Sequence, residues 1–131
     1  MDIPKFRIYV PREKRIADVR YINCEDGYAV YICKNDTTST HNAFIEDDNL
    51  MMSSGKKDKN GKEIFEGDII KGTIVSQWAK HEIICVVKYV NCKFVSVDGG
   101  KWEHSLMFAK NIEVIGNIYD NPEILEEARW K

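Results

Sequence analysis

Residues 57–71 read KDKNGKEIFEGDIIK and are the most organised part of the 131-residue chain. Asn60-Gly61 stands between a charged run and an apolar run, which predicts a two-residue β-hairpin turn. Gly67 predicts a sharp corner, because glycine adopts backbone angles that strain other residues. Residues 68–75 then have the composition of a strand. The stretch therefore predicts a hairpin, a glycine corner and a strand.

Two ligand sites that such an Asp- and Gly-rich run could form do not fit its spacing. An EF-hand needs carboxylates at its first and twelfth positions, and these would be Lys56 and Gly67. A phosphate-binding P-loop needs a different glycine spacing and a helix after it, whereas a strand is expected after Gly67. Turn geometry accounts for both glycines of the stretch.

Short strands dominate the rest of the chain. One helix is expected at 122–129, because Asn121 suits an N-cap, Pro122 the first turn and Glu123 the positive end of the helix dipole. Runs with strand composition are expected to form strands at 5–10, 16–24, 28–33, 83–90, 93–97 and 111–119, with a short edge strand at 41–45.

This pattern predicts a mainly β fold, since many short strands with glycine turns are typical of a small bent barrel or paired sheets. An N-terminal lobe, a hairpin or meander, is expected at 1–49. A C-terminal lobe with the barrel and the short helix is expected at 50–131, although the two could form one compact domain. The polar segment 46–60 is the expected boundary.

The predicted geometry of the first hairpin shows whether its two cysteines could form a disulfide. A tight turn at Asp26-Gly27 would place Cys24 opposite Ala29. Cys24 and Cys33 would then lie on the order of 13 Å apart along the sheet, which is too far for a disulfide. We expect four free thiols.

Composition and charge restrict the possible partners. The formal net charge is −2, so no global basic field favours nonspecific nucleic-acid binding. The N-terminal segment is locally basic, however, and Arg12, Lys14 and Arg15 form a candidate nucleic-acid patch. The start of the chain does not resemble a secretory signal, and the longest apolar run, 83–87, is too short to span a bilayer. A cytosolic protein that does not bind membranes is expected.

No catalytic or metal-binding set stands out. Acidic neighbours of histidine occur at Glu82 and Glu103, but their spacing does not call for a metal, so neither metal nor cofactor is expected. A hydrolase or metalloenzyme would have to assemble Asp68, His81, Glu103 and His104 from distant parts of the chain. A non-enzymatic protein is the prediction, and that assembly is the alternative.

Two segments combine tryptophan with basic residues. The segments SQWAKHE (76–82) and GGKWEHS (99–105) are expected to be loops between strands. Such loops can stack a base or grip a peptide, although both tryptophans could instead cap the core. The candidate partner-binding residues are Trp78, Lys80, His81, Lys101, Trp102 and His104.

Three stretches occur in the order and spacing of a family signature: PKFRIYVPREKRIADV (4–19), LMMSSGKKDKNGKEIFEGDIIKG (50–72) and IEVIGNIYDNPEIL (112–125). They resemble the YopX-like proteins, which are small proteins encoded by bacteriophages and prophages. Lys56 stands where that family usually has leucine, and Ser53 stands near an expected aromatic residue. The resemblance implies an SH3-like barrel in the C-terminal lobe, a phage or prophage origin and the bacterial host cytoplasm. It implies no activity.

The function predicted from these observations is that of an accessory protein that binds a host or phage protein without catalysing a reaction. The alternative is a small β-barrel protein that binds nucleic acid through the basic N-terminal patch and the tryptophan loops. The oligomeric state is not constrained by the sequence.

Overall fold

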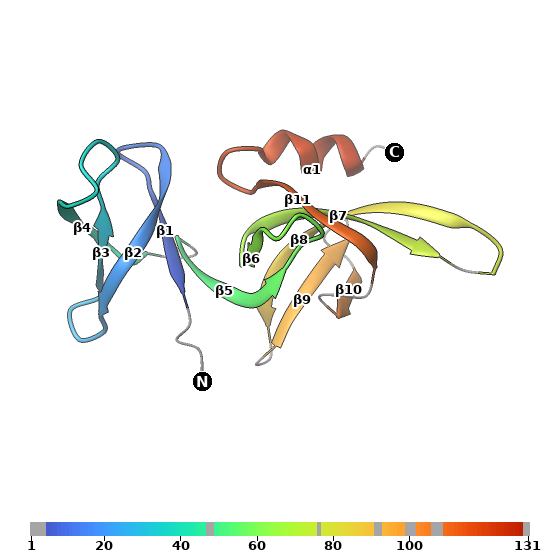
Figure 1. Cartoon of the computed structure of the whole chain (residues 1–131), viewed down its shortest axis with the longest axis horizontal. Coiled ribbons are helices and arrows are strands. Elements are labelled where there is room, and N and C mark those ends of the chain that lie inside the picture. The colour runs from blue at the N-terminus through green and yellow to red at the C-terminus, as the bar shows by residue number, and fades with distance from the viewer. Residues whose placement is uncertain are drawn as a thin grey trace. The chain divides into compact units, whose positions relative to one another are not determined.

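The computed structural model describes residues 5–46, 49–75, 77–90, 93–98, 102–105 and 109–129, and of 90, 98, 102–105 and 127–129 only the backbone. Eleven strands and one helix lie in these residues (Figure 1). The expected all-β class with one C-terminal helix is confirmed. The chain divides into two compact units, Met1–Ser53 and Ser54–Lys131. The sequence placed the division at 49/50, whereas it falls inside a strand.

The first unit is an antiparallel sheet with the strand order β4-β3-β2-β1-β5. Its core consists of the inward-facing side chains Ile8, Val10, Ala17, Ala29 and Tyr31, each at most 3% exposed. The strands are β1 (Phe6–Val10), β2 (Arg15–Asn23), β3 (Tyr28–Ile32), β4 (Thr40–Phe44) and the start of β5 (Leu50–Lys57).

Asn49 connects β4 to β1 in this unit. Its carbonyl oxygen accepts the backbone N–H of Tyr9 in β1 at 2.9 Å. Its side-chain amide donates to the carbonyl oxygen of Phe44 in β4 at 3.0 Å. The segment between β4 and β5 is therefore fixed to β1 and to β4, which explains why Asn49 is itself buried.

The register predicted for the first hairpin is wrong by two residues. Ile22, not Cys24, lies opposite Ala29. The reason is a longer turn, in which the N–H of Gly27 donates to the carbonyl oxygen of Asn23. The Asn23 side chain supports that turn by accepting a backbone N–H, as asparagine often does in turns.

A β-bulge follows in the same hairpin, between Val19 and Tyr21. The bulge changes which face each side chain occupies. Val19 packs against the core, whereas Tyr21 is 58% exposed. Strict alternation along the strand would put the two residues on one face, and a sequence pattern does not reveal a bulge.

The thiols of the described residues are free. Cys24 is exposed, Cys33 is half-buried and Cys85 is buried in the core of the second unit. Cys92 lies outside the described residues. The prediction of free thiols is confirmed for Cys24, Cys33 and Cys85.

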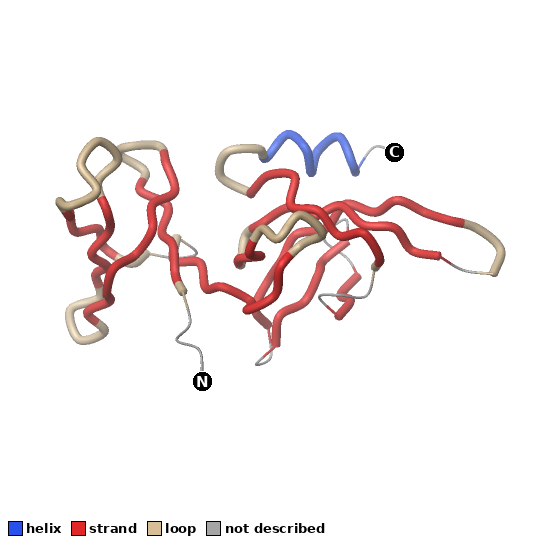
Figure 2. Tube along the Cα trace, in the orientation of Figure 1, coloured by secondary structure: helices blue, strands red, loops and turns tan. Residues whose placement is uncertain are grey.

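The second unit contains a five-stranded antiparallel sheet with the order β10-β9-β8-β7-β11 (Figure 2). Its core consists of Ile64, Ile70, Cys85, Val87 and Ile112. The elements are β6 (Glu63–Phe65), β7 (Asp68–Val75), β8 (Lys80–Val90), β9 (Lys93–Asp98), β10 (Trp102–Ser105), β11 (Lys110–Asn117) and α1 (Pro122–Arg129).

The expected barrel is not closed, because the described strand order ends at β10 and β11. The outer side of β11 is occupied by the turn between β5 and β6. There the N–H of Lys59 donates to the carbonyl oxygen of Ile112 at 2.8 Å, and the N–H of Val114 donates to the Asp58 carboxylate at 2.9 Å. This turn therefore bonds to backbone groups of β11 that a further strand would need in order to close the barrel.

Two segments that were expected to be loops contribute residues to strands. β8 begins at Lys80 rather than at residue 83, and β10 occupies Trp102–Ser105. Strand pairing explains both, since Lys80 lies opposite Val75 of β7 and Trp102 lies opposite Asp98 of β9. Polar residues form strands here because a neighbouring strand supplies the hydrogen bonds.

The helix begins and ends as predicted, at Pro122 and Arg129. The Asn121 side chain accepts the N–H of Asn117 at 3.3 Å and so braces the loop before the helix, which differs from the expected N-cap. Within the described residues, no helix has the length and apolar character that crossing a membrane requires.

Candidate functional site

Asp58, in the stretch that decides the fold, is a structural residue. Its carboxylate accepts three backbone N–H groups at 2.9 Å each, from Asn60, Lys62 and Val114. Burial opposes ionisation, but the amides of Val114, Lys62 and Asn60 outweigh it and lower the pKa of Asp58. The residue joins the β5–β6 turn to β11, and both oxygens of its carboxylate accept hydrogen bonds in doing so.

The corner that follows is also structural. The Asp68 carboxylate is 1% exposed and accepts the N–H of Phe65 at 2.8 Å. Gly67 has a φ of +87°, donates to the carbonyl oxygen of Val87 and accepts the N–H of Ile118. Residues 58–68 therefore act through geometry, but the turn is one residue longer than predicted, because the N–H of Asp58 donates to the carbonyl oxygen of Lys62 at 2.8 Å and leaves residues 59–61 in the loop.

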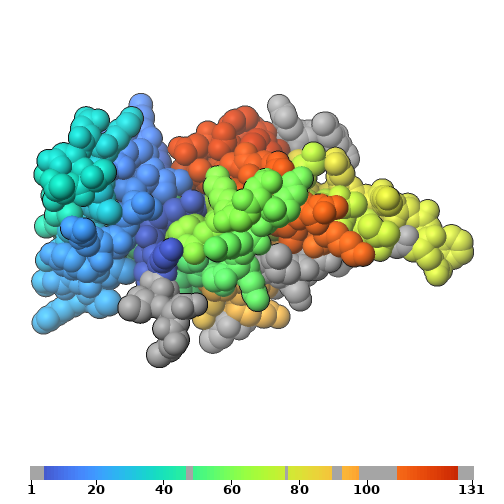
Figure 3. Space-filling view, in the orientation of Figure 1, coloured from blue at the N-terminus to red at the C-terminus, as the bar shows by residue number. Residues whose placement is uncertain are grey.

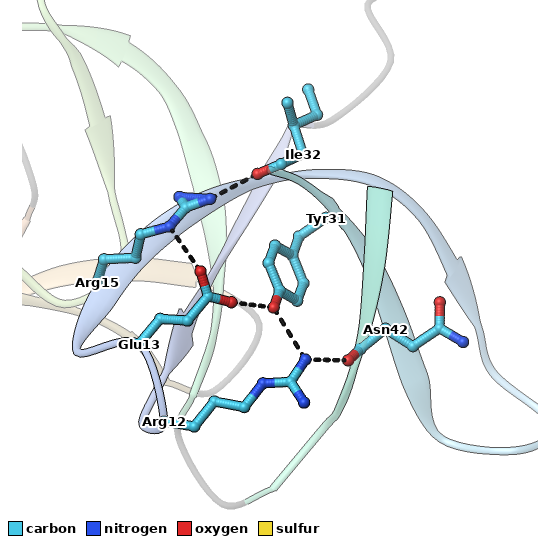
Figure 4. A network of polar contacts seen from close by, with 6 residues as sticks. All are labelled: Arg12, Glu13, Arg15, Tyr31, Ile32 and Asn42. Atoms are coloured by element: carbon cyan, nitrogen blue, oxygen red, sulfur yellow. Dashed lines mark hydrogen bonds and ion pairs between the residues drawn. The ribbon is translucent and has the colours of Figure 1, made fainter. Parts of the chain in front are cut away.

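The candidate nucleic-acid patch lies in the turn between β1 and β2, and its two arginines are engaged inside the first unit (Figure 4). Arg12 donates to the Tyr31 hydroxyl at 3.1 Å and to the carbonyl oxygen of Asn42 at 3.3 Å. Arg15 donates to the carbonyl oxygen of Ile32 at 2.6 Å. These contacts fix the turn onto β3 and β4.

Glu13 lies between the two arginines and offsets part of their charge. It accepts hydrogen bonds from the Tyr31 hydroxyl and, at 3.3 Å, from Arg15 Nε. Burial and the bond to Glu13 raise the pKa of Tyr31. Lys14 is exposed and has a φ of +50°. Of the three patch residues, Lys14 presents its side chain to solvent without a described contact.

The second unit carries a two-stranded arm. β11 pairs with β7 only as far as Thr73, which lies opposite Lys110. β9 pairs with β8 only from Cys85, which lies opposite Asp98. Between these limits β7 and β8 pair only with each other among the described strands, and residues 74–75 and 77–84 form a hairpin that projects from the sheet (Figures 1 and 3). We call these residues the arm.

Three of the predicted partner-binding residues lie together on the arm. Trp78 is 86% exposed, so the alternative in which it caps the core is wrong. Lys80 is exposed opposite Val75, which is itself 49% exposed. His81 is exposed opposite Ile74. The arm therefore displays an aromatic and an aliphatic side chain beside basic groups.

The second predicted group is not on a loop. Trp102 and His104 belong to β10, the edge strand beyond β9, where they lie opposite Asp98 and Ser96. Lys101 lies outside the described residues. The backbone positions of Trp102 and His104 thus belong to the edge of the sheet and not to the arm.

The residues of the hypothetical hydrolase are not brought together. His81 lies opposite Ile74, which is six residues from Asp68 along β7, or about 20 Å at the rise of a strand. Ser96 lies opposite His104 on one side and opposite Val87 of β8 on the other. Val87 is six residues from His81 along β8, so His81 and His104 are separated by about 20 Å along the strands. Among the described residues, no group of three histidine, cysteine or acidic side chains could hold a metal ion.

Comparisons with known proteins identify one family. A family model described as YopX protein matches residues 5–126. The crystal structure of protein EF1440 from Enterococcus faecalis is similar, with 27% identity, a TM-score of 0.61 and coverage of 95% of this chain and 99% of that one. No curated protein sequence matches significantly.

Proposed function

The chain belongs to the YopX protein family, and from that membership we propose that it is a bacteriophage or prophage accessory protein that works in the bacterial cytoplasm. Its role is to bind another protein, of the host or the phage, through the arm and without catalysis. One observation carries the proposal: Trp78 is 86% exposed on a hairpin that projects from the sheet.

The composition of the arm favours protein binding. Exposed tryptophan contributes little to folding, whereas in an interface it is among the residues that contribute most to affinity. Val75 adds apolar surface next to the basic Lys80, and His81 lies on the other face of the arm. A two-stranded hairpin is only marginally stable alone, so contact with a partner would stabilise the arm itself.

Nucleic-acid binding is less well supported. The guanidinium groups of Arg12 and Arg15 are hydrogen-bonded within the first unit, next to Glu13. Their charge is therefore partly offset and their orientation is fixed. The net charge of −2 adds no attraction for phosphates.

A capture experiment tests the proposal. Tagged protein is incubated with bacterial lysate at two salt concentrations, with and without nuclease, and the retained material is compared between wild type and Trp78→Ala. Phe44→Ala is the control, because Phe44 is also an exposed aromatic residue, at 73% exposure, but lies on β4 in the first unit.

We expect a discrete protein that survives nuclease, is retained by Phe44→Ala and is reduced at least tenfold by Trp78→Ala. Equal retention by both variants would contradict a role for the arm. Nucleic acid that is retained at low salt and released at high salt would instead favour the alternative function.

A further inference from the structure

We propose that the partner binds as an extended, acidic strand that adds to the outer edge of β8 along residues 80–84. This inference rests on the proposed function, since it specifies how the arm recognises a protein. Strand addition supplies main-chain hydrogen bonds for affinity, and side chains on alternate positions supply specificity.

The outer edge of β8 is unpaired along this stretch. β7 occupies one side of residues 80–84. On the other side β9 ends at Asp98, which lies opposite Cys85 and is already paired with Trp102 of β10. β9 therefore goes no further along β8, and no described strand pairs with residues 80–84 on that side.

The outer edge of β4, by contrast, is covered by side chains. On either side of β4, Ser39 and Ile45 hydrogen-bond towards the β3 side, so the backbone groups of Asn42 and Phe44 point outward. The outward carbonyl oxygen of Asn42 accepts the Arg12 guanidinium, and that of Phe44 accepts the Asn49 amide. Side chains thus occupy acceptors that an added strand would need.

The outer side of β11 is covered in a comparable way. The carbonyl oxygen of Ile112 accepts the N–H of Lys59, and the N–H of Val114 donates to Asp58. Proteins commonly protect sheet edges against unwanted pairing. β4 and β11 have such protection in the described residues, whereas the arm has none, which marks the arm as an edge kept available.

The charge of the arm indicates the kind of strand that would fit. Opposite residues share a face of a sheet, so Lys71, Lys80, Lys110, Glu82 and Glu113 lie on the same face as Val75. Three lysines and two glutamates make this face positive by one charge, in a chain whose net charge is −2. Glu82 is also paired with Lys71 at 3.5 Å. An acidic strand with an apolar residue for Val75 complements this face.

A strand fits this edge better than a nucleic acid does. An exposed β edge alternates N–H donors with carbonyl acceptors, and only another peptide backbone matches both. Phosphate oxygens accept hydrogen bonds but cannot donate to the carbonyl groups. The chemistry of the edge therefore selects a peptide from among anionic partners.

Amide hydrogen exchange, measured by NMR on the full chain, tests the inference. The probes are eight-residue peptides that alternate valine with glutamate or valine with lysine, and a glutamate peptide whose valines are replaced by proline. We expect the valine–glutamate peptide to slow every second amide in 80–84 at least tenfold, since the other amides already bond to β7. It should bind at least tenfold more tightly than the lysine peptide, and the proline peptide should not bind.

Two surface variants provide the charge control. Lys80→Glu should weaken the valine–glutamate peptide at least tenfold, whereas Lys34→Glu, an exposed lysine of the first unit, should leave its affinity unchanged. The inference is overturned if this peptide does not bind at millimolar concentration, if it protects no alternating set of amides, or if a single-stranded DNA oligonucleotide protects the same amides.

The two proposals can fail separately. A captured protein that depends on Trp78 but does not slow exchange at 80–84 would overturn strand addition and leave the arm as the binding surface. A captured protein that is indifferent to Trp78 would overturn the proposed function itself, whatever the peptides show.

Discussion

At the scale of single residues, the acidic side chains that most resemble ligand or catalytic groups are those whose carboxylates accept backbone hydrogen bonds. Asp58 stands two residues before Asn60-Gly61, where an aspartate often accepts turn amides, and that signal was available in the sequence. Its bond to Val114, 56 residues away, was not, because it depends on how β11 meets the turn. The sequence could exclude a calcium site but could not assign Asp58 its structural role.

We predict that Asp58→Asn destabilises the protein by about 1–3 kcal/mol, because an amide replaces one acceptor oxygen by a donor that faces a backbone N–H. Urea unfolding at neutral pH measures the loss. Glu126→Gln, which neutralises an exposed carboxylate in the same unit, is the control and should change stability by less than about 0.5 kcal/mol.

The pH dependence of this difference follows from the direction of the shift. Because the pKa of Asp58 is lowered in the folded protein, its contribution is complete above the unfolded value of about 3.9 and is lost as pH falls through the folded pKa. The gap in stability between wild type and Asp58→Asn should therefore be widest near neutral pH and shrink below about pH 4. A gap that widened in acid would contradict this assignment.

At the scale of elements, the pattern of residues identifies most strands and the helix, but not their register. The turn at 24–27 and the bulge after Val19 moved side chains between faces, and alternation in one strand contains no information about either. Only the end of the arm, residues 76–82, was predicted as a loop, and part of that segment belongs to β8. The arm is a hairpin because β7 and β8 pair beyond the point where the third strand ends.

Gly72 lies where β7 meets the segment before β11. A Cβ at this position would lie 2.8 Å from the Cβ of Ala109 and 3.4 Å from Cγ1 of Ile112. We predict that Gly72→Ala destabilises the protein by about 1–2 kcal/mol, since crowding outweighs the gain from a less flexible unfolded chain. Thermal unfolding measures the change.

A second substitution tests that cause. Ala109→Gly removes the atom closest to the added Cβ, so the double variant should regain most of the stability that Gly72→Ala alone loses. If the two changes were simply additive, crowding between β7 and the segment before β11 would not be the reason for the loss.

At the scale of the whole molecule, each unit has a core of its own. The buried cluster of the first unit lies within residues 8–31 and that of the second within 64–112, with no residue in common. The sequence indicated two lobes from the polar segment between them. It could not place the division inside β5, because the sequence pattern put residues 50–57 within the polar boundary 46–60, whereas they form one strand whose pairing changes from β1 to β6 along it.

Separate cores predict separate unfolding. Tyr31→Phe removes the hydroxyl that joins Arg12 to Glu13 and should increase amide exchange in the first unit alone, whereas Asp58→Asn should do so in the second unit alone. Native-state hydrogen exchange at low denaturant measures both patterns on the full chain. If either variant accelerated the slowest amides of both units equally, the protein would unfold as one cooperative body, and the division after Ser53 would have no energetic meaning.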